Sequence, residues 1–185
     1  MANDRRVRYT KRVLGECLIR LLKEKPLSRV TVSELCRMAE INRSTYYTHY
    51  ANPYDQLEQM ERELLDNLAH IMEAGRGHES DLDVIAEVCR YYWDNRDLFL
   101  LLDNSNTAAS YNYREINALQ NSAFSAWEAQ NYQYSGIERE YAYTYVIAGT
   151  NGVLHKWLHQ EDGQFSPEQM AALLQQFIDY GLRGH

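Results

Sequence analysis

The stretch NRSTYYTH, Asn42 to His49, holds the side chains best suited to direct hydrogen-bond chemistry with a large polar ligand. At about 100° per residue, a helix here would place Tyr46, His49 and Tyr50 on one side. The other side would carry polar side chains, some of them long, and no acidic residue. We call this side the polar face. Arginine can pair with guanine, hydroxyls can serve bases or phosphates, and tyrosine can reach a phosphate or a thymine methyl. The polar face consists of Arg43, Ser44, Tyr47 and Thr48.

The charge distribution favours a polyanionic ligand for this part of the chain. The whole chain has a net charge of −7, but residues 1–50 carry 11 Lys and Arg against 5 Asp and Glu. An acidic protein with a basic first quarter indicates that this quarter meets a polyanion. An interaction helix with exposed tyrosines is the alternative, since aromatic residues favour protein interfaces. That alternative does not explain the basic balance and the acid-free face together.

Helical periodicity runs through nearly the whole chain and predicts an all-α fold. Strand-like alternation is absent, and no repeat or low-complexity tract occurs. The expected helices cover residues 9–24, a short helix from 32, a short helix from 43 to about 50, and residues 53–73, 82–95, 97–103, 109–130, 136–159 and 167–182.

Capping signals define the starts of the helices around the polar face. Thr31 and Glu34 have the spacing of a capping box, in which each residue satisfies a backbone amide of the other. Asn42 is a suitable N-cap for the next helix, and Asn52 precedes Pro53 at the first position of a longer one. Ser166 occupies the same position before the last helix. Two short helices joined by a tight turn after a longer amphipathic helix are typical of a helix-turn-helix DNA reader.

Residues 8–58 resemble the DNA-binding domain of the tetracycline-repressor (TetR/AcrR) family of bacterial regulators. The resemblance is carried by VTVSELCRMAEINRSTYYTHYANPYDQL and by the amphipathic helix before it. It implies a helix-turn-helix DNA-binding domain at 1–52 and a helical regulatory and dimerisation domain at 53–185. Position by position, it implies that Arg43, Ser44 and Thr48 face bases, that Tyr47 faces a base or a phosphate, and that phosphates are held by Thr31, Ser33, Thr45, Tyr47 and His49.

Two positions depart from the usual pattern of that family. Glu40 stands where the turn commonly has glycine, which predicts strain if the turn needs a positive φ. Pro53 stands where many members have a lysine that touches phosphate. We expect a basic N-terminal arm to offset that loss by lying along the DNA backbone or in the minor groove; it contains Arg5, Arg6, Arg8, Lys11 and Arg12.

The resemblance also implies a homodimer and a small-molecule effector for the C-terminal part. The last two helices would form the interface, through Gly149, Gly152, Val153, Trp157, Leu174, Phe177 and Ile178, although a stripe packed within one chain remains the alternative. An aromatic-rich region at 80–150 suits an amphipathic ligand, while aromatic residues at helical spacing also build ordinary cores. The candidate pocket residues are Tyr91, Trp93, Phe99, Tyr113, Phe124, Trp127 and Tyr143.

Other classes of function find little support in the sequence. His155 and His159 have a spacing that can hold zinc, but no third ligand is apparent, so no metal and no cofactor is expected. No nucleophile motif or phosphate loop occurs, which argues against an enzyme. No apolar run is long enough to span a membrane, and no signal peptide is apparent. Three cysteines without metal spacing indicate free thiols and a cytoplasmic location.

The sequence therefore predicts a cytoplasmic, homodimeric, ligand-responsive repressor that binds a palindromic double-stranded DNA operator. The alternatives are a co-activator of the same fold, and a protein-interaction module that has kept the fold without independent DNA binding. Glu40 and Pro53 are the features that favour the interaction module.

Overall fold

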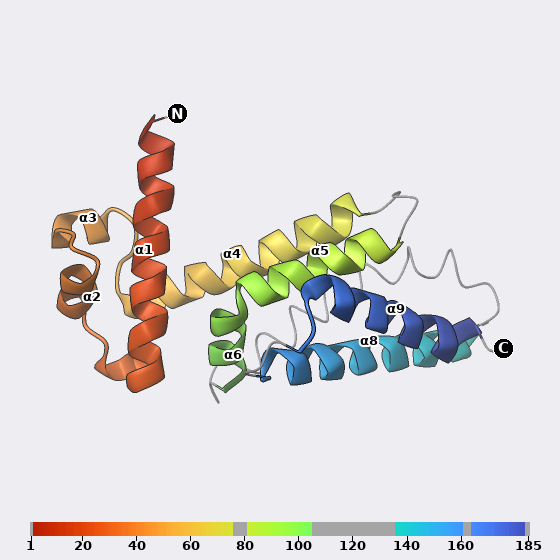
Figure 1. The fold of residues 1–185 in the computed structure, drawn as a ribbon. Helices are drawn as coiled ribbons and strands as arrows, with labels where there is room; N and C mark the ends of the chain where they lie inside the picture. The colour runs from red at the N-terminus through yellow and green to blue at the C-terminus, as the bar shows by residue number, and fades with distance from the viewer. Residues whose placement is uncertain (1, 76–80, 105–135, 161–163, 184–185) are drawn as a thin grey trace. The chain divides into compact units, whose positions relative to one another are not determined.

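The computed structural model describes residues 2–75, 81–104, 136–160 and 164–183. These segments are helical, and no strand occurs among them, as the periodicity predicted. The chain divides into two compact units, Met1–Leu64 and Leu65–His185. The division falls inside α4, Pro53–Ala74, so the first turns of this helix belong to the first unit. Figure 1 shows the elements of each unit.

The first unit consists of α1, Ala2–Glu24, a short 3-10 turn at Leu27–Arg29, α2, Val32–Met38, α3, Arg43–Tyr47, and the start of α4. Within this unit, α2 packs against both α1 and α3 (Figure 1). The apolar stripe of α1 forms the centre of the core, because Leu14 and Leu18 are fully buried. Burial of each such side chain contributes about 1.5–3 kcal/mol, which holds α1 against the two shorter helices.

A buried glutamine ties the start of α4 to α1. The side chain of Gln56 is fully buried, and its Nε2 donates a hydrogen bond to the carbonyl oxygen of Leu14 at 2.9 Å. One turn further along α4, the methyl carbon of Met60 lies 3.3 Å from the position that a Cβ would take at Gly15. The absence of a side chain at Gly15 therefore permits α4 to approach α1 closely at this point.

The second unit is built from the rest of α4 with α5, Asp81–Asp94, α6, Arg96–Asn104, α8, Gly136–Leu158, and α9, Pro167–Arg183. Its most extensive packing among the described segments is between α5 and α9. Trp157 of α8 is buried in its core and stacks on Trp93 of α5, with ring centroids 4.9 Å apart. The indole nitrogen of Trp157 also donates to the carbonyl oxygen of Phe165 at 3.0 Å, so the segment before α9 is fixed to the end of α8.

Arg96 closes the C-terminal end of α8. Its Nε donates to the carbonyl oxygen of Leu158 at 2.6 Å, and its Nη2 donates to that of Gln160 at 3.1 Å. Carbonyl groups in the last turn of a helix lack partners within the helix, and a cation there also complements the helix dipole. The Arg96 guanidinium lies 5.2 Å from the ring centroid of Trp93 as well, so one side chain joins α6, α5 and α8.

Most observed helix bounds lie within a residue or two of the expected ones, with two exceptions. The expected start of the first helix at residue 9 was wrong, since α1 begins at Ala2. Its first turns contain arginines, which are good helix formers, but no apolar periodicity that would reveal them. The third helix ends at Tyr47 rather than near residue 50. The helix expected at 109–130 lies outside the described residues.

The three cysteines are buried free thiols. Cys17 and Cys36 belong to the core of the first unit and Cys89 to that of the second. Burial raises the pKa of all three thiols, and that of Cys89 to about 12. They therefore remain protonated at neutral pH and act as small apolar core residues.

Candidate nucleic-acid interface

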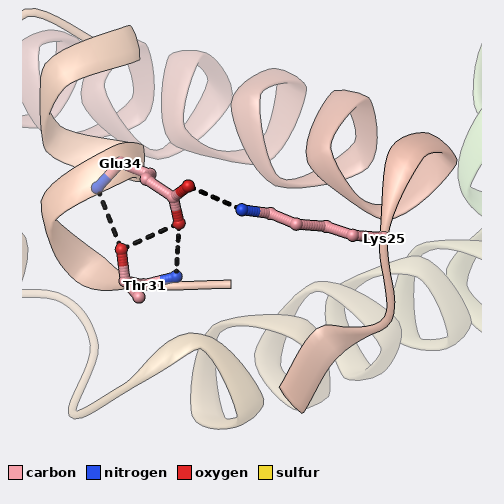
Figure 2. A network of polar contacts seen from close by, with 3 residues as sticks. All are labelled: Lys25, Thr31 and Glu34. Atoms are coloured by element: carbon pink, nitrogen blue, oxygen red, sulfur yellow. Dashed lines mark hydrogen bonds and ion pairs between the residues drawn. The ribbon is translucent and has the colours of Figure 1, made fainter. Parts of the chain in front are cut away.

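The start of α2 is fixed by the capping box that the sequence predicted. The amide of Glu34 donates to Thr31 Oγ1 at 3.3 Å, and the amide of Thr31 donates to Glu34 Oε2 at 3.1 Å (Figure 2). Lys25 Nζ lies 2.6 Å from the other carboxylate oxygen. The hydrogen bonds from Lys25 and then from Thr31 lower the pKa of Glu34 to about 2, so this carboxylate is ionised at neutral pH.

This network argues against the phosphate contact expected from Thr31. A threonine hydroxyl has one hydrogen to donate, and a phosphate oxygen can only accept. Thr31 Oγ1 lies 2.8 Å from Glu34 Oε2 and donates its hydrogen to that ionised carboxylate (Figure 2). The cap and a phosphate contact therefore compete for the single hydroxyl hydrogen of Thr31, and a phosphate role for this residue stays a prediction.

The turn between α2 and α3 has the left-handed residue that the sequence pattern suggested. Glu40 has a φ of 53°. Its amide donates to the carbonyl of Arg37 at 3.4 Å, and the amide of Ile41 donates to that of Cys36 at 3.0 Å. This is the hydrogen-bond pattern of a Schellman motif, in which glycine usually occupies the position of Glu40. The turn therefore keeps its geometry with a residue that is strained there.

The polar face of α3 points away from the core, as expected. Tyr46 and Tyr50 are buried, with 0% and 3% of their surface exposed, and join α3 to the core of the first unit. All four residues of the polar face are exposed, and Tyr47 retains 57% of its surface. Asn42 precedes α3, but its side chain makes no capping hydrogen bond.

Aromatic contacts fix the orientation of α3. The ring of Tyr46 meets that of Tyr47 edge-on, with centroids 5.7 Å apart, and lies 5.7 Å from that of Tyr50. The Tyr46 hydroxyl is buried without a hydrogen-bond partner, and desolvation raises its pKa. His49 is half-buried beside Tyr50, with ring centroids 6.2 Å apart. A packing role therefore competes with the phosphate role expected for His49.

Two hydrogen bonds set what the polar side chains can offer to a ligand. Arg43 Nη2 donates to Ser33 Oγ at 2.5 Å, which joins the polar face to α2. Thr48 Oγ1 donates to the carbonyl oxygen of Thr45 at 2.6 Å. Because that bond uses the only hydroxyl hydrogen of Thr48, this exposed residue can offer a ligand its hydroxyl lone pairs and its methyl group but no hydroxyl hydrogen. Ser44 is exposed, and Thr45 is half-buried.

The first turn of α4 is closed by its own side chains. Asn52 Oδ1 accepts from the amides of Tyr54 and Asp55 at 2.9 and 3.0 Å, which confirms Asn52 as the cap before Pro53. Asp55 Oδ2 accepts from the amide of Ala51 at 2.7 Å. These three amides are therefore not available to a phosphate. Pro53 also stands where the family pattern has a phosphate-binding lysine. The role of Asp55 was missed, although an acid at the third helix position is a known cap signal.

The expected N-terminal arm is the continuation of α1, and several of its cations already have partners. Lys11 Nζ lies 2.5 Å from Glu63 Oε1 of α4, and Arg12 Nη1 lies 2.6 Å from Glu16 Oε1. The helical backbone excludes an extended path through a minor groove for residues 2–12 as they are described. Arg5 and Arg6, on the first turns of α1, are exposed.

The aromatic residues expected around a pocket pack on one another in the second unit. Phe99 stacks on Tyr92 at 4.2 Å and meets Tyr91 edge-on at 6.5 Å. Trp93 stacks on Trp157, and Tyr143 is buried, with a pKa raised to about 12 by desolvation. Tyr113, Phe124 and Trp127 lie outside the described residues. The described members thus form contacts typical of a core, and a pocket among them stays a prediction.

The residues expected at a dimer interface fall into two groups. Trp157 and Leu174 are buried in the second unit's own core, where they offer almost no surface to a partner, so the helical stripe there is intramolecular. By contrast, Gly149, Gly152 and Phe177 are exposed, and Val153 and Ile178 are half-buried. Apart from the neighbouring backbone of α8 itself, no heavy atom of the described residues lies within 4 Å of a Cβ built on either glycine. The expected interface residues did not include the exposed Ile137, Tyr141, Tyr145 and Tyr180.

The described residues contain no group of three or more potential ligands that could hold a metal ion. His155 and His159 lie side by side on α8, with ring centroids 4.3 Å apart, and His159 Nδ1 is 2.9 Å from the carbonyl oxygen of His155. Within the described segments, no helix is both long and apolar enough to cross a membrane.

Sequence comparison relates the chain to transcriptional regulators. Residues 79–180 match the sequence model of the TetR group that describes a transcriptional regulator C-terminal region. A stretch of 81 residues is 33% identical to the HTH-type transcriptional regulator YxbF of Bacillus subtilis strain 168. This stretch covers 43% of the chain and 21% of YxbF, so the chain spans about a fifth of that relative's length.

Structure comparison shows the same fold at low sequence identity. A transcriptional regulator from Aquifex aeolicus VF5 has a TM-score of 0.71 and 12% identity, covering 92% of this chain and 98% of that one. The fatty acid degradation regulator FadR from Bacillus halodurans has a TM-score of 0.67 and 14% identity, covering 95% of both chains.

Proposed function

This chain belongs to the TetR family of transcriptional regulators, and we propose that it represses transcription by binding a palindromic operator as a homodimer. The polar face of α3 is the observation that carries the proposal. Its four side chains are exposed and free of acid, while Tyr46 and Tyr50 anchor the same helix in the core. A helix held in this way can enter a major groove without rearrangement of the unit.

Each side chain of the polar face has a chemically suitable target in a major groove. Arg43 can pair with guanine O6 and N7, and its guanidinium remains charged at any physiological pH. Thr48 presents its methyl group to a thymine methyl, since its hydroxyl hydrogen is bonded within the chain. Tyr47 and Ser44 can donate to a base or a phosphate. We place Ser33, Thr45 and His49 at phosphates and leave Thr31 as a helix cap.

A dimer would supply the second recognition helix that a palindrome requires. One helix reads only a few base pairs, whereas two at a fixed spacing read two half-sites. The exposed surface of α8 supports this proposal, since Ile137, Tyr141 and Tyr145 recur every four residues and retain 65–69% of their surface. Gly149 and Gly152 lie further along the same helix and are also exposed. Their lack of a side chain leaves room for a partner helix.

We further propose a small-molecule effector that binds in the second unit and releases DNA. Aromatic side chains of α5 and α6 support an amphipathic ligand of this kind, for which tyrosine-rich walls are suitable. Such a ligand shifts the equilibrium only by its differential affinity for the DNA-binding and released states.

A protein-interaction module without independent DNA binding is the second candidate. The first turn of α4 favours this candidate. Pro53 stands where many members of the family have a lysine that touches phosphate, and the amides of Tyr54 and Asp55 already donate to Asn52. Co-activation is a variant of this candidate in which a partner protein delivers the chain to DNA.

The test is selection of bound sequences from a random pool of double-stranded DNA by the purified protein, first at low salt. We expect a palindrome with two half-sites whose centres are one helical turn, or a multiple of it, apart. Affinity for it should fall by roughly 10³–10⁵ between 50 and 200 mM salt if 6–10 phosphates are contacted. Failure to enrich any sequence at low salt would reject unaided DNA reading and favour the interaction module.

Arg43 provides the sharper test of which residues read bases. Arg43→Ala should cost about 1–3 kcal/mol on the selected operator and relax selectivity at one position of each half-site. Arg43→Lys is the matched control, because it keeps the charge but loses the planar fork that pairs with guanine. It should restore affinity in part without restoring selectivity. An equal loss of affinity on all sequences for Arg43→Ala would exclude base reading by this residue.

A further inference from the structure

A hydrogen bond between two exposed side chains connects α2 and α3. Arg43 Nη2, at the start of α3, donates to Ser33 Oγ of α2 at 2.5 Å. Both residues are exposed, so the bond does not arise from burial. An arginine side chain has several rotatable bonds, and fixing an unrestrained one in a single geometry costs conformational entropy on binding. A guanidinium that is already held in place avoids part of that cost.

We propose that Ser33 is a positioning residue that determines specificity, by holding Arg43 in the orientation that reads its base pair. The inference rests on the proposed function, in which α3 enters a major groove. It assigns Ser33 a second role besides phosphate binding, namely control of selectivity at the base pair that Arg43 contacts.

The donors of the two side chains suffice for this arrangement. A guanidinium has five N–H groups and the bond to Ser33 uses one of them, so four remain, and guanine O6 and N7 need two. Ser33 accepts from Arg43, while its own hydroxyl hydrogen has no acceptor among the described residues. That hydrogen is directed outward or free to rotate outward, where a phosphate oxygen could accept it. Ser33 can thus connect a phosphate, which sets register, to the arginine that reads a base.

The other hydroxyl at the start of α2 cannot take this role. Thr31 donates its hydrogen to Glu34, as Figure 2 shows, and its lone pair accepts from the Glu34 amide. The same network occupies the carboxylate next to Ser33, since Lys25 and Thr31 bind the two oxygens of Glu34. Arg43 is therefore held by a neutral hydroxyl and keeps its full positive charge for DNA. A carboxylate partner would have offset that charge.

The experiment measures binding of the selected operator and of its single base-pair variants to wild-type protein, Ser33→Ala, Arg43→Ala and the double variant. Arg43→Ala first identifies the position at which selectivity is lost. Ser33→Ala should lower selectivity at that same position about threefold to tenfold, the effect of one hydrogen bond, and leave the other positions unchanged. In the Arg43→Ala background it should change selectivity no further. Ser33→Thr, which keeps the hydroxyl, should preserve selectivity.

Unchanged selectivity in Ser33→Ala, or an equal loss on every sequence, would overturn the inference and leave Ser33 as a phosphate contact alone. Failure of the wild-type protein to select any sequence would instead reject the proposed function. A measurement on the protein without DNA tests the role of Ser33 independently of the proposed function. The Nε–H group of Arg43 should be more ordered by NMR relaxation than that of the exposed Arg37, also on the α2–α3 side of the first unit, and Ser33→Ala should remove the difference. Equal mobility of the two arginine side chains in the wild-type protein would show that the hydrogen bond from Arg43 to Ser33 does not form.

Discussion

At the scale of single residues, the first unit depends on a few hydrogen bonds whose donors and acceptors can be counted. Glu34 is the clearest case, because Lys25, the Thr31 hydroxyl and the Thr31 amide all bind its carboxylate. Each of these interactions is stronger with the ionised form, because donors bind a charged carboxylate more tightly than a neutral carboxyl. The cap of α2, and through it the position of the helix before the polar face, is therefore sensitive to acid.

Replacement of Glu34 by glutamine should alter the stability of the protein in a defined pH window. The pKa of Glu34 falls from 4.5 to about 2 on folding, so its contribution is complete above about 4.5 and is lost as the pH falls towards 2. Thermal unfolding of wild-type protein and Glu34→Gln should differ at pH 6, and the difference should shrink steadily as the pH falls from about 4.5 towards 2. Glu58→Gln, which removes an exposed pair with Arg62, is the control. A constant difference across the window would contradict the assignment.

Glu40 offers the opposite case, in which a substitution should stabilise. Its φ of 53° favours glycine, and relief of that conformation outweighs the greater freedom of glycine in the unfolded chain. Glu40→Gly should raise the free energy of unfolding by about 0.5–1 kcal/mol in urea denaturation. Glu40→Ala, which retains a Cβ, is the matched control and should give no gain. Equal stability of the glycine and alanine variants would show that the turn is unstrained.

At the scale of the elements, close helix contacts can be tested through glycine. A Cβ at Gly75, after the end of α4, would lie 2.5 and 2.6 Å from the two methyl carbons of Val84 on α5. Gly75→Ala should therefore destabilise the second unit by about 1–3 kcal/mol. The double variant Gly75→Ala/Val84→Ala lacks the obstructing methyl groups. Gly75→Ala should therefore cost less stability in the Val84→Ala background than in the wild-type protein. Additive losses would show that the two positions do not meet.

Helix starts were predictable wherever a cap residue marks them. Thr31, Asn52 and Ser166 each precede the helix that the sequence indicated, and Ser166 Oγ accepts from the amide of Gln169 at 3.3 Å as expected. The start of α1 was not predictable from periodicity, because the apolar residues before Tyr9 are few and do not recur at helical spacing. The division of α3 into a buried and an exposed side was correct, since a period of 3.6 residues determines it once one side has a core to cover.

Other features depend on contacts that a pattern cannot specify. The apolar stripe through Trp157 and Leu174 is visible in the sequence, but whether it faces its own chain or a second copy depends on the partner helices. Likewise, the direction of the Thr31 hydroxyl depends on the ionised Glu34 beside it. The bond from Arg43 to Ser33 joins residues ten positions apart, and only the geometry of the turn brings them together.

At the scale of the whole molecule, charge and symmetry decide how the protein would meet DNA. Residues 1–50 have a balance of +6, and residues 51–185 one of −13. A polyanion attracts the first part and repels the second, so encounter through the α2–α3 side is electrostatically favoured. The same repulsion reduces unspecific adhesion of the second unit to DNA.

Disruption of the exposed α8 surface should separate the two copies of the proposed homodimer. Tyr141 and Tyr145 retain 69% and 67% of their surface in the single chain, and a carboxylate at either position would be desolvated in a helix-to-helix interface. Tyr141→Glu and Tyr145→Glu should therefore yield monomers in sedimentation velocity and weaken binding to the full palindrome more than to a half-site. Glu87→Lys, on the exposed side of α5, is the control. A dimer that persists in both variants would place the interface elsewhere.

The burial of the three cysteines has a practical consequence for testing the proposed homodimer. Thiols with raised pKa values inside two cores react slowly with maleimides and methanethiosulfonates, so the native chain offers little background to such reagents. A single cysteine introduced at the exposed Tyr54 would then carry a spin label almost alone. In a homodimer this one substitution gives a pair of labels, and pulsed electron paramagnetic resonance would report the separation of the two DNA-binding units directly.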